Sequence, residues 1–118
     1  MKLTIYHYPQ CGTCRSAIKW LEQRGHELEK KHIVEQTPTK EELKGYLKSG
    51  VELKKLFNTA GQVYREMDLK NQLPDMTEEE QLELLSSNGM LLKRPIVTDG
   101  KKVTVGFKED VYQQQWGA

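Results

Sequence analysis

The sequence predicts an α/β fold in which helices surround a mixed sheet, and two observations predict this class. Near the N-terminus a short apolar strand, an amphipathic helix and a second strand follow in the order of a β-α-β unit. Near the C-terminus two β-branched runs flank an Asp-Gly turn and precede a helical stretch, which is a β-β-α order. Because the stretch between these units has helical periodicity, we expect a mixed sheet with helices around it.

The sequence predicts the bounds of each element of the β-α-β unit. Residues 3–6 form the expected first strand, and residues 14–24 carry apolar side chains at helical spacing. Gly25 follows as a good C-cap. In residues 27–33 apolar and polar side chains alternate weakly, and the stretch ends at β-branched residues. We therefore expect it to form a strand that pairs in parallel with the first strand.

Two capping boxes predict helices in the middle of the chain. Thr39 precedes Glu42 by three residues, and Thr77 precedes Glu80 by the same spacing. Each pair is followed by apolar residues at helical spacing, so a helix is expected after each threonine. Shorter helical turns are expected at residues 51–57 and 63–67.

The last part of the chain predicts a hairpin and a helix. Residues 96–98 and 103–105 are β-branched runs on either side of Asp99-Gly100-Lys101, a strong hairpin signal. Residues 108–116 then close the chain as a short helix.

Composition excludes several classes of function. The 118 residues fit one domain, and 18 basic against 17 acidic residues give a net charge of +1. Such a balance argues against direct nucleic-acid binding and against a membrane partner. We see no signal-peptide pattern and no stretch of membrane-span length, so a cytoplasmic protein is expected. In a reducing compartment a lone Cys-x-x-Cys is more often catalytic, redox-sensing or metal-binding than a permanent crosslink.

The Cys-x-x-Cys motif lies where the first strand gives way to the helix. This order puts Cys11 at the mouth of the helix and Cys14 inside its first turn. Unpaired backbone N–H groups and the positive end of the helix dipole favour a thiolate at Cys11, and Arg15 adds a nearby cation. Gly12 and Thr13 serve the turn and free backbone N–H groups for an anion. The motif therefore predicts an attacking sulfur at Cys11 with a second sulfur in reach.

The two cysteines have two alternatives to a chemical role, as zinc ligands or as residues of the core. A closed zinc site needs four ligands, and the chain offers two cysteines and three histidines without a second paired motif, so no metal site is predicted. The cysteines are otherwise small buried hydrophobic residues of the core. We expect His26 and His32 to be structural. His7, at the end of the first strand, either assists proton transfer and anion binding or has no role.

These features together resemble a known fold and family. A β-α-β unit with Cys-x-x-Cys at the start of its helix, followed by a proline-led hairpin and a helix, resembles the thioredoxin fold. The helical middle resembles the insertion of the arsenate reductase (ArsC) family, which also holds the Spx and YffB proteins. The resemblance implies one thioredoxin-like domain over residues 1–118 with an insertion at about 38–90. Its most specific stretches are residues 4–15 (TIYHYPQCGTCR) and 92–97 (LKRPIV).

The resemblance to glutathione- and glutaredoxin-dependent arsenate reductases implies roles for four residues. In those enzymes the cysteine matching Cys11 attacks the arsenic oxyanion, the histidine matching His7 lies close to it, and the arginine matching Arg94 helps to bind the anion. Pro95 matches a proline that is usually cis and faces the active cysteine, so we expect a cis Arg94–Pro95 bond. No bound cofactor is implied; glutathione, thioredoxin or glutaredoxin would supply electrons.

Two departures from those enzymes change the expected chemistry. They hold the anion with three arginines, and two of these fall near Asn58 and Phe107 here, although Arg65 is close in sequence to the first. Losing two guanidinium groups weakens oxyanion binding. Cys14 stands where those enzymes commonly have serine, so an internal disulfide is the expected oxidised state. We therefore predict a thiol-dependent oxidoreductase that acts on an oxyanion or a disulfide.

A resemblance to the Spx regulators implies an alternative of a different class. They share the Cys-x-x-Cys motif, a glycine in the helical middle, matched by Gly50, and a basic pair before the hairpin proline, matched by Lys93-Arg94. This alternative is a redox-sensing regulator that binds RNA polymerase. Spx proteins carry further basic sequence after their last helix, whereas this chain stops at residue 118. Its length fits the uncharacterised ArsC-like members better.

Overall fold

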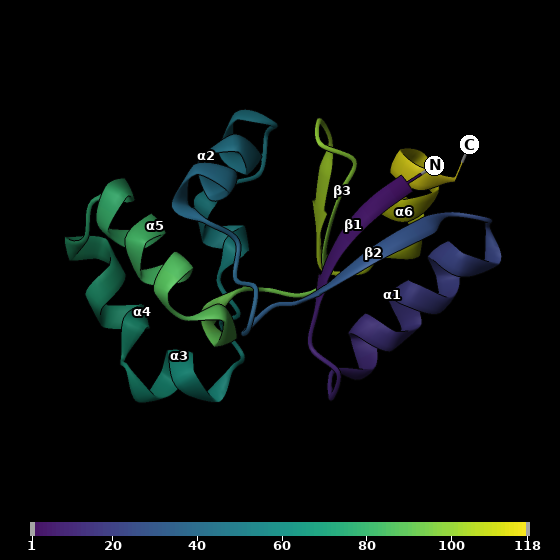
Figure 1. Ribbon diagram of the computed structural model, residues 1–118. Helices are drawn as coiled ribbons and strands as arrows, with labels where there is room; N and C mark the ends of the chain where they lie inside the picture. The colour runs from purple at the N-terminus through teal and green to yellow at the C-terminus, as the bar shows by residue number, and fades with distance from the viewer. Residues whose placement is uncertain (1, 118) are drawn as a thin grey trace.

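The computed structural model describes residues 2–117, whose four strands form one mixed sheet in the order β2-β1-β3-β4 (Figure 1). β1 (Lys2–His7) pairs in parallel with β2 (Glu27–His32) and antiparallel with β3 (Ile96–Thr98). β3 pairs antiparallel with β4 (Val103–Val105), so β2 and β4 are the two edges. The predicted mixed α/β sheet, its parallel β-α-β unit and its hairpin are confirmed.

One face of the sheet is covered by α1 (Gly12–Gln23) and α6 (Glu109–Trp116), which lie on the same side in Figure 1. Because successive strand residues point to opposite faces, Leu3 and Ile5 of β1 share this side. They are buried in a cluster with apolar residues of both helices and of β3: Ala17, Trp20, Leu21, Val97, Tyr112 and Trp116.

The helical middle of the chain packs on the opposite face, where Tyr6 and Ile96 join a larger buried cluster. In Figure 1 these helices stand together on the other side of the sheet from α1. Leucines make up most of the cluster. The helices are α2 (Lys40–Lys48), α3 (Gln62–Glu66), α4 (Leu69–Gln72) and α5 (Glu78–Ser87), with 3₁₀ turns at Leu53–Leu56, Leu73–Asp75 and Gly89–Leu91.

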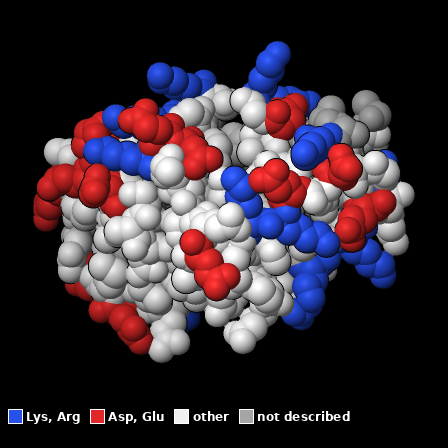
Figure 2. All heavy atoms as spheres, viewed as in Figure 1, with Lys and Arg blue, Asp and Glu red and all other residues white. Residues whose placement is uncertain are grey.

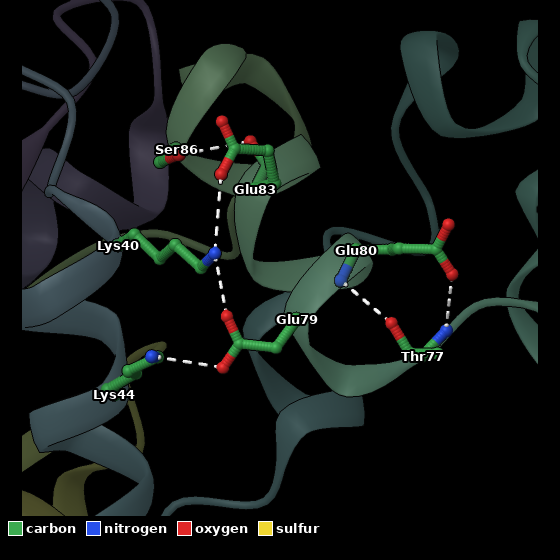
Figure 3. A network of polar contacts seen from close by, with 7 residues as sticks. All are labelled: Lys40, Lys44, Thr77, Glu79, Glu80, Glu83 and Ser86. Atoms are coloured by element: carbon green, nitrogen blue, oxygen red, sulfur yellow. Dashed lines mark hydrogen bonds and ion pairs between the residues drawn. The ribbon is translucent and has the colours of Figure 1, made fainter.

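Both predicted capping boxes are present. The Thr39 hydroxyl accepts the Glu42 N–H at 3.1 Å, and the Glu42 carboxylate accepts the Thr39 N–H at 3.0 Å. Thr77 and Glu80 repeat the arrangement at the start of α5, as Figure 3 shows. Each box satisfies two of the N–H groups that a helix start leaves unpaired.

A small network of ion pairs joins α2 to α5 (Figure 3). The Glu79 carboxylate lies 2.7 Å from Lys40 Nζ and 2.9 Å from Lys44 Nζ. All three side chains are solvent-accessible, so these pairs contribute little free energy. In Figure 2 acidic and basic side chains lie side by side over α2 and α5.

The structure departs from the predicted elements in the middle of the chain. The helix expected at residues 51–57 is only a 3₁₀ turn, Leu53–Leu56, because Phe57 leaves it to form an antiparallel bridge with Leu92. Helix α4 was not predicted, and Asp68 enters it in the left-handed conformation with φ 52°. Across residues 2–117, no helix has the length and apolar character that crossing a membrane requires.

Two glycines make a matched test of this packing. A Cβ at Gly89 would lie 2.1 Å from the Ile33 carbonyl oxygen, whereas a Cβ at Gly45 in α2 would meet nothing within 4 Å. We expect Gly89→Ala to lower the free energy of unfolding by about 1–3 kcal/mol, since backbone must move. Gly45→Ala should raise it by about 0.5–1 kcal/mol through helix propensity. Urea denaturation measures both; equal effects would contradict the packing at Gly89.

Candidate functional site

Cys11 is the N-cap residue of α1, as its sequence position predicts. Its extended backbone (φ −86°, ψ 112°) aims the side chain back over the helix, and its Sγ accepts the Cys14 N–H at 3.3 Å. The Cys11 N–H donates to the Tyr8 carbonyl at 2.9 Å, which closes the turn between β1 and α1. A sulfur thus occupies the place where helices usually carry a serine or aspartate oxygen.

The two thiols differ sharply in their surroundings. Cys11 is half-buried, whereas Cys14 is fully buried beneath it. Burial opposes ionisation of Cys11, but hydrogen bonds from the Cys14 thiol and N–H, together with the Arg94 guanidinium, outweigh it and lower the pKa of Cys11. Burial, followed by the hydrogen bond and charge of Cys11, raises the pKa of Cys14 to about 12. Cys11 is therefore the more readily ionised thiol of the pair, and Cys14 keeps its proton to much higher pH.

Arg94 comes to Cys11 from the start of the hairpin, and its bond to Pro95 is cis, as predicted. The Arg94 Cζ atom lies 5.1 Å from the centre of the Tyr8 ring, a cation–π contact that holds the guanidinium beside the Cys11 turn. Its Nε and Nη1 atoms are buried and have no hydrogen-bond partner within residues 2–117. Because a buried unpaired donor costs free energy, these N–H groups are placed to receive an acceptor from a ligand.

Cys11 and Arg94 open into one cavity of about 350 Å³. Lys93 and Lys108 add two further cations to its wall, and none of its described lining residues is acidic. The cavity is therefore electropositive and holds a partly exposed thiol, which is the environment of a reactive cysteine. Its other lining residues are Thr13, Asn58, Val105, Gly106 and Phe107.

His7 is not among the residues that line this cavity. The ring of His7 is 6.5 Å from that of His32, whose Nδ1 accepts the Val34 N–H at 3.2 Å. Burial, followed by the charges of His32 and Lys30, lowers the pKa of His7, which favours the neutral imidazole. Within residues 2–117, no group of three or more potential metal-ligating side chains lies together.

The structure places the remaining predicted site residues in two groups. Thr13 lines the cavity with Cys11, and Pro95 is buried next to Arg94. Gly12 and Arg15 are exposed and lie outside the cavity wall. Arg15 instead donates from Nη1 to the Pro9 carbonyl at 2.9 Å, which braces the turn.

Asn58 and Phe107, the positions matched to two missing arginines, both reach the cavity wall. Arg65 does not line it; this side chain donates from Nη2 to the Ala60 carbonyl at 2.9 Å. Lys108 also lines the cavity, although no sequence motif around it predicts a functional role. It lies far along the chain from Cys11, and only the path of the hairpin into α6 brings the two together.

Thiol reactivity tests this electrostatic arrangement. We expect iodoacetamide to label Cys11 before Cys14. Alkylation of Cys11 should remain fast at pH values below the pKa of an ordinary cysteine. Arg94→Ala should move the midpoint of that rate profile to higher pH, because the guanidinium favours the thiolate. Arg15→Ala should move it less, since Arg15 is bonded to Pro9. Faster labelling of Cys14, or equal shifts in the two variants, would contradict the assignment.

Relatives of this chain include both uncharacterised proteins and regulators. It is 62% identical to the uncharacterised protein YusI of Bacillus subtilis over 98% of this chain and 99% of that protein. It is 37% identical to the regulatory protein MgsR of Bacillus subtilis, covering 90% of this chain and 83% of MgsR. The global transcriptional regulator Spx of Enterococcus faecalis is 33% identical over 92% of this chain and 81% of Spx.

Solved structures show the same fold along nearly the whole chain. An ArsC family related protein from Bacteroides fragilis superposes with a TM-score of 0.91 at 46% identity and covers 97% of both chains. A protein from Streptococcus mutans described as "a possible arsenate reductase" gives 0.85 at 38% identity, covering 92% of this chain and 96% of that one. The ArsC family model matches residues 6–115. The chain is a member of the ArsC family.

Proposed function

We propose that this protein is a thiol-dependent oxidoreductase in which Cys11 is the nucleophile and Cys14 resolves the intermediate. One observation carries the proposal: the half-buried Sγ of Cys11 caps α1 beside Arg94, whose Nε and Nη1 donors are buried without a partner. This geometry combines a stabilised thiolate with unfilled donors for an incoming acceptor. The substrate is an oxyanion or a disulfide, and the second thiol, Cys14, next to Cys11 favours the disulfide.

In the first step the Cys11 thiolate attacks one sulfur of a substrate disulfide. A new S–S bond forms between Cys11 and that sulfur, the substrate S–S bond breaks, and the leaving thiolate takes a proton from solvent. The cations of the cavity, Arg94, Lys93 and Lys108, favour the charge that develops on the leaving sulfur.

In the second step Cys14 becomes the attacking group. Once Cys11 is in a mixed disulfide it no longer carries a negative charge, so two of the causes that raise the pKa of Cys14 disappear. Cys14 then loses its proton to solvent, attacks Cys11 Sγ and expels the second substrate thiolate. The substrate gains two electrons, and the protein is left with a Cys11–Cys14 disulfide. An external thiol of the glutathione, thioredoxin or glutaredoxin class returns it to the dithiol.

Regulation of transcription is the second candidate function, because relatives at 37% and 33% identity are a regulatory protein and a global transcriptional regulator. In this case the Cys11–Cys14 disulfide would be a signal, with RNA polymerase as the partner. Capture of RNA polymerase that changes between the reduced and oxidised protein would support this function. Equal capture of both forms, or none, would count against it.

Single cysteine variants separate the two roles. Cys14→Ser should accumulate a mixed disulfide at Cys11 during turnover with oxidised glutathione, because the intramolecular escape is removed. Cys11→Ser should form no adduct under the same conditions, since its remaining thiol is buried. Mass spectrometry of the intact protein measures both. If the two variants form equal amounts of adduct, the nucleophile and resolving roles fail.

The rate of arsenate reduction tests whether the substrate is an oxyanion or a disulfide. We expect arsenate reduction with glutathione and glutaredoxin to be slower than disulfide reduction by at least about a hundredfold. The reason is that one guanidinium replaces three, at roughly 1.5–3 kcal/mol for each lost charged bond. Coupled NADPH oxidation measures both rates. Comparable turnover of arsenate would show that Lys93 or Lys108 completes the anion site, and alanine at each would identify which.

A further inference from the structure

The β4 edge of the sheet opens into a groove of about 900 Å³ that the chemistry at Cys11 does not use. β4 (Val103–Val105) runs along it from end to end. One wall comes from the segment around the first 3₁₀ turn, including Val51 and Thr59, and the other from Val111 and Gln115 of α6. Because these walls belong to the two opposite faces of the sheet, the groove follows the free edge of β4.

The backbone of β4 has N–H and C=O groups that face the groove. The Gly106 N–H donates to the Pro95 carbonyl at 2.9 Å on the β3 side. Since antiparallel pairing alternates along a strand, the N–H and C=O groups of Val103 and Val105 point away from β3. Within residues 2–117, these four groups have no hydrogen-bond partner beyond the sheet. An edge of this kind accepts a further strand.

The groove is strongly basic. Glu52 is the one acidic residue among its described lining, and it is paired with Lys54 at 3.4 Å. The Lys102 Nζ atom donates a hydrogen bond to the Gln115 carbonyl oxygen at 2.8 Å. The other four lysines form no ion pair within residues 2–117. Six lysines line the groove: Lys54, Lys55, Lys93, Lys101, Lys102 and Lys108.

The groove leads to the Cys11 cavity. Lys93, Val105, Gly106 and Lys108 line both, so the two spaces meet where β4 ends. A chain that pairs with β4 therefore reaches Cys11 when it passes Gly106.

We propose that this groove binds an extended acidic segment of a partner polypeptide, which adds a strand to β4 and presents a disulfide to Cys11. The last part rests on the proposed function, and the docking itself does not. Backbone pairing at Val103 and Val105 supplies direction along the groove, while the lysines select glutamate- or aspartate-rich segments.

Two other occupants fit the groove less well. The sugar-phosphate backbone of a nucleic acid offers phosphate acceptors but no N–H donors that alternate with them as in a β-strand. The aromatic residues of the lining, Phe57 and Tyr112, are buried and unavailable for base stacking. A second copy of this chain pairing through β4 would bring the lysines of both copies together, and their like charges repel.

Docking is measured with the full chain carrying Cys11→Ser and Cys14→Ser, so that no exchange occurs. The probe is a fluorescein-labelled peptide in which glutamate alternates with threonine and valine. A matched peptide with lysine for glutamate and a single-stranded oligonucleotide of equal charge are the comparisons. We expect fluorescence anisotropy to detect binding of the acidic peptide alone. Its binding should slow hydrogen exchange at the amides of Val103 and Val105.

Lysine variants outside the Cys11 cavity test the charge. Lys55→Glu and Lys101→Glu should each weaken binding of the acidic peptide by about two- to fivefold, as for exposed ion pairs. Lys19→Glu and Lys70→Glu, at exposed positions away from the groove, should leave it unchanged. Equal effects in the two sets, or binding of the oligonucleotide with no binding of the acidic peptide, would overturn the docking proposal.

An exchange measurement on the wild-type protein separates this inference from the proposed function. A cystine-containing acidic peptide should be reduced with a lower KM than its lysine counterpart, and Lys55→Glu should make that difference in KM smaller by about two- to fivefold. The same variant should reduce neutral hydroxyethyl disulfide at the wild-type rate. Docking without any exchange would refute the proposed oxidoreductase and leave the groove assignment standing. Exchange with no preference for the acidic peptide would refute the groove assignment.

Discussion

The hydrogen bond from the Cys14 N–H to Cys11 Sγ is the interaction on which the rest of the site depends. It makes a sulfur the N-cap of α1, and so ties a reactive group to the start of a rigid helix. It also fixes the two thiols in unequal places, with one at the cavity and the other beneath it in the core. A cap formed by oxygen would satisfy the helix equally well. A sulfur cap in addition gives the helix start a thiol, which ionises far more readily than a hydroxyl.

The sheet supplies what the helix alone lacks. A helix N-terminus and its dipole lower the pKa of a thiol, but they do not bind a substrate. The antiparallel β3–β4 hairpin brings Arg94 to the same point, where Tyr8 holds its guanidinium and leaves two donors unfilled. Since β1 carries the Cys11 turn at its end and pairs directly with β3, the two halves of the site are joined through the centre of the sheet.

Local patterns were enough to predict the strands, the capped helices and the cysteine pair. Thr39 and Thr77 each identify a helix start because a capping box acts within four residues. The position of Cys11 at the start of α1 could be predicted for the same reason, because it depends only on nearby residues. Arg94 was found through resemblance to a family, whereas the place of Lys108 at the cavity depends on how the hairpin turns into α6. The left-handed entry to α4 at Asp68 also left no pattern in the sequence.

Burial, together with the hydrogen bond and the charge of Cys11, raises the pKa of Cys14 and keeps its proton in place until Cys11 has reacted. NMR titration of the cysteine Cβ resonances tests it directly, with Cys11 first free and then capped by iodoacetamide. In the free protein Cys11 should titrate below the usual range, while the pKa of Cys14 stays near 12. Capping removes the hydrogen bond and charge of the thiolate, so the pKa of Cys14 should fall. An unchanged pKa of Cys14 after capping would contradict the claim.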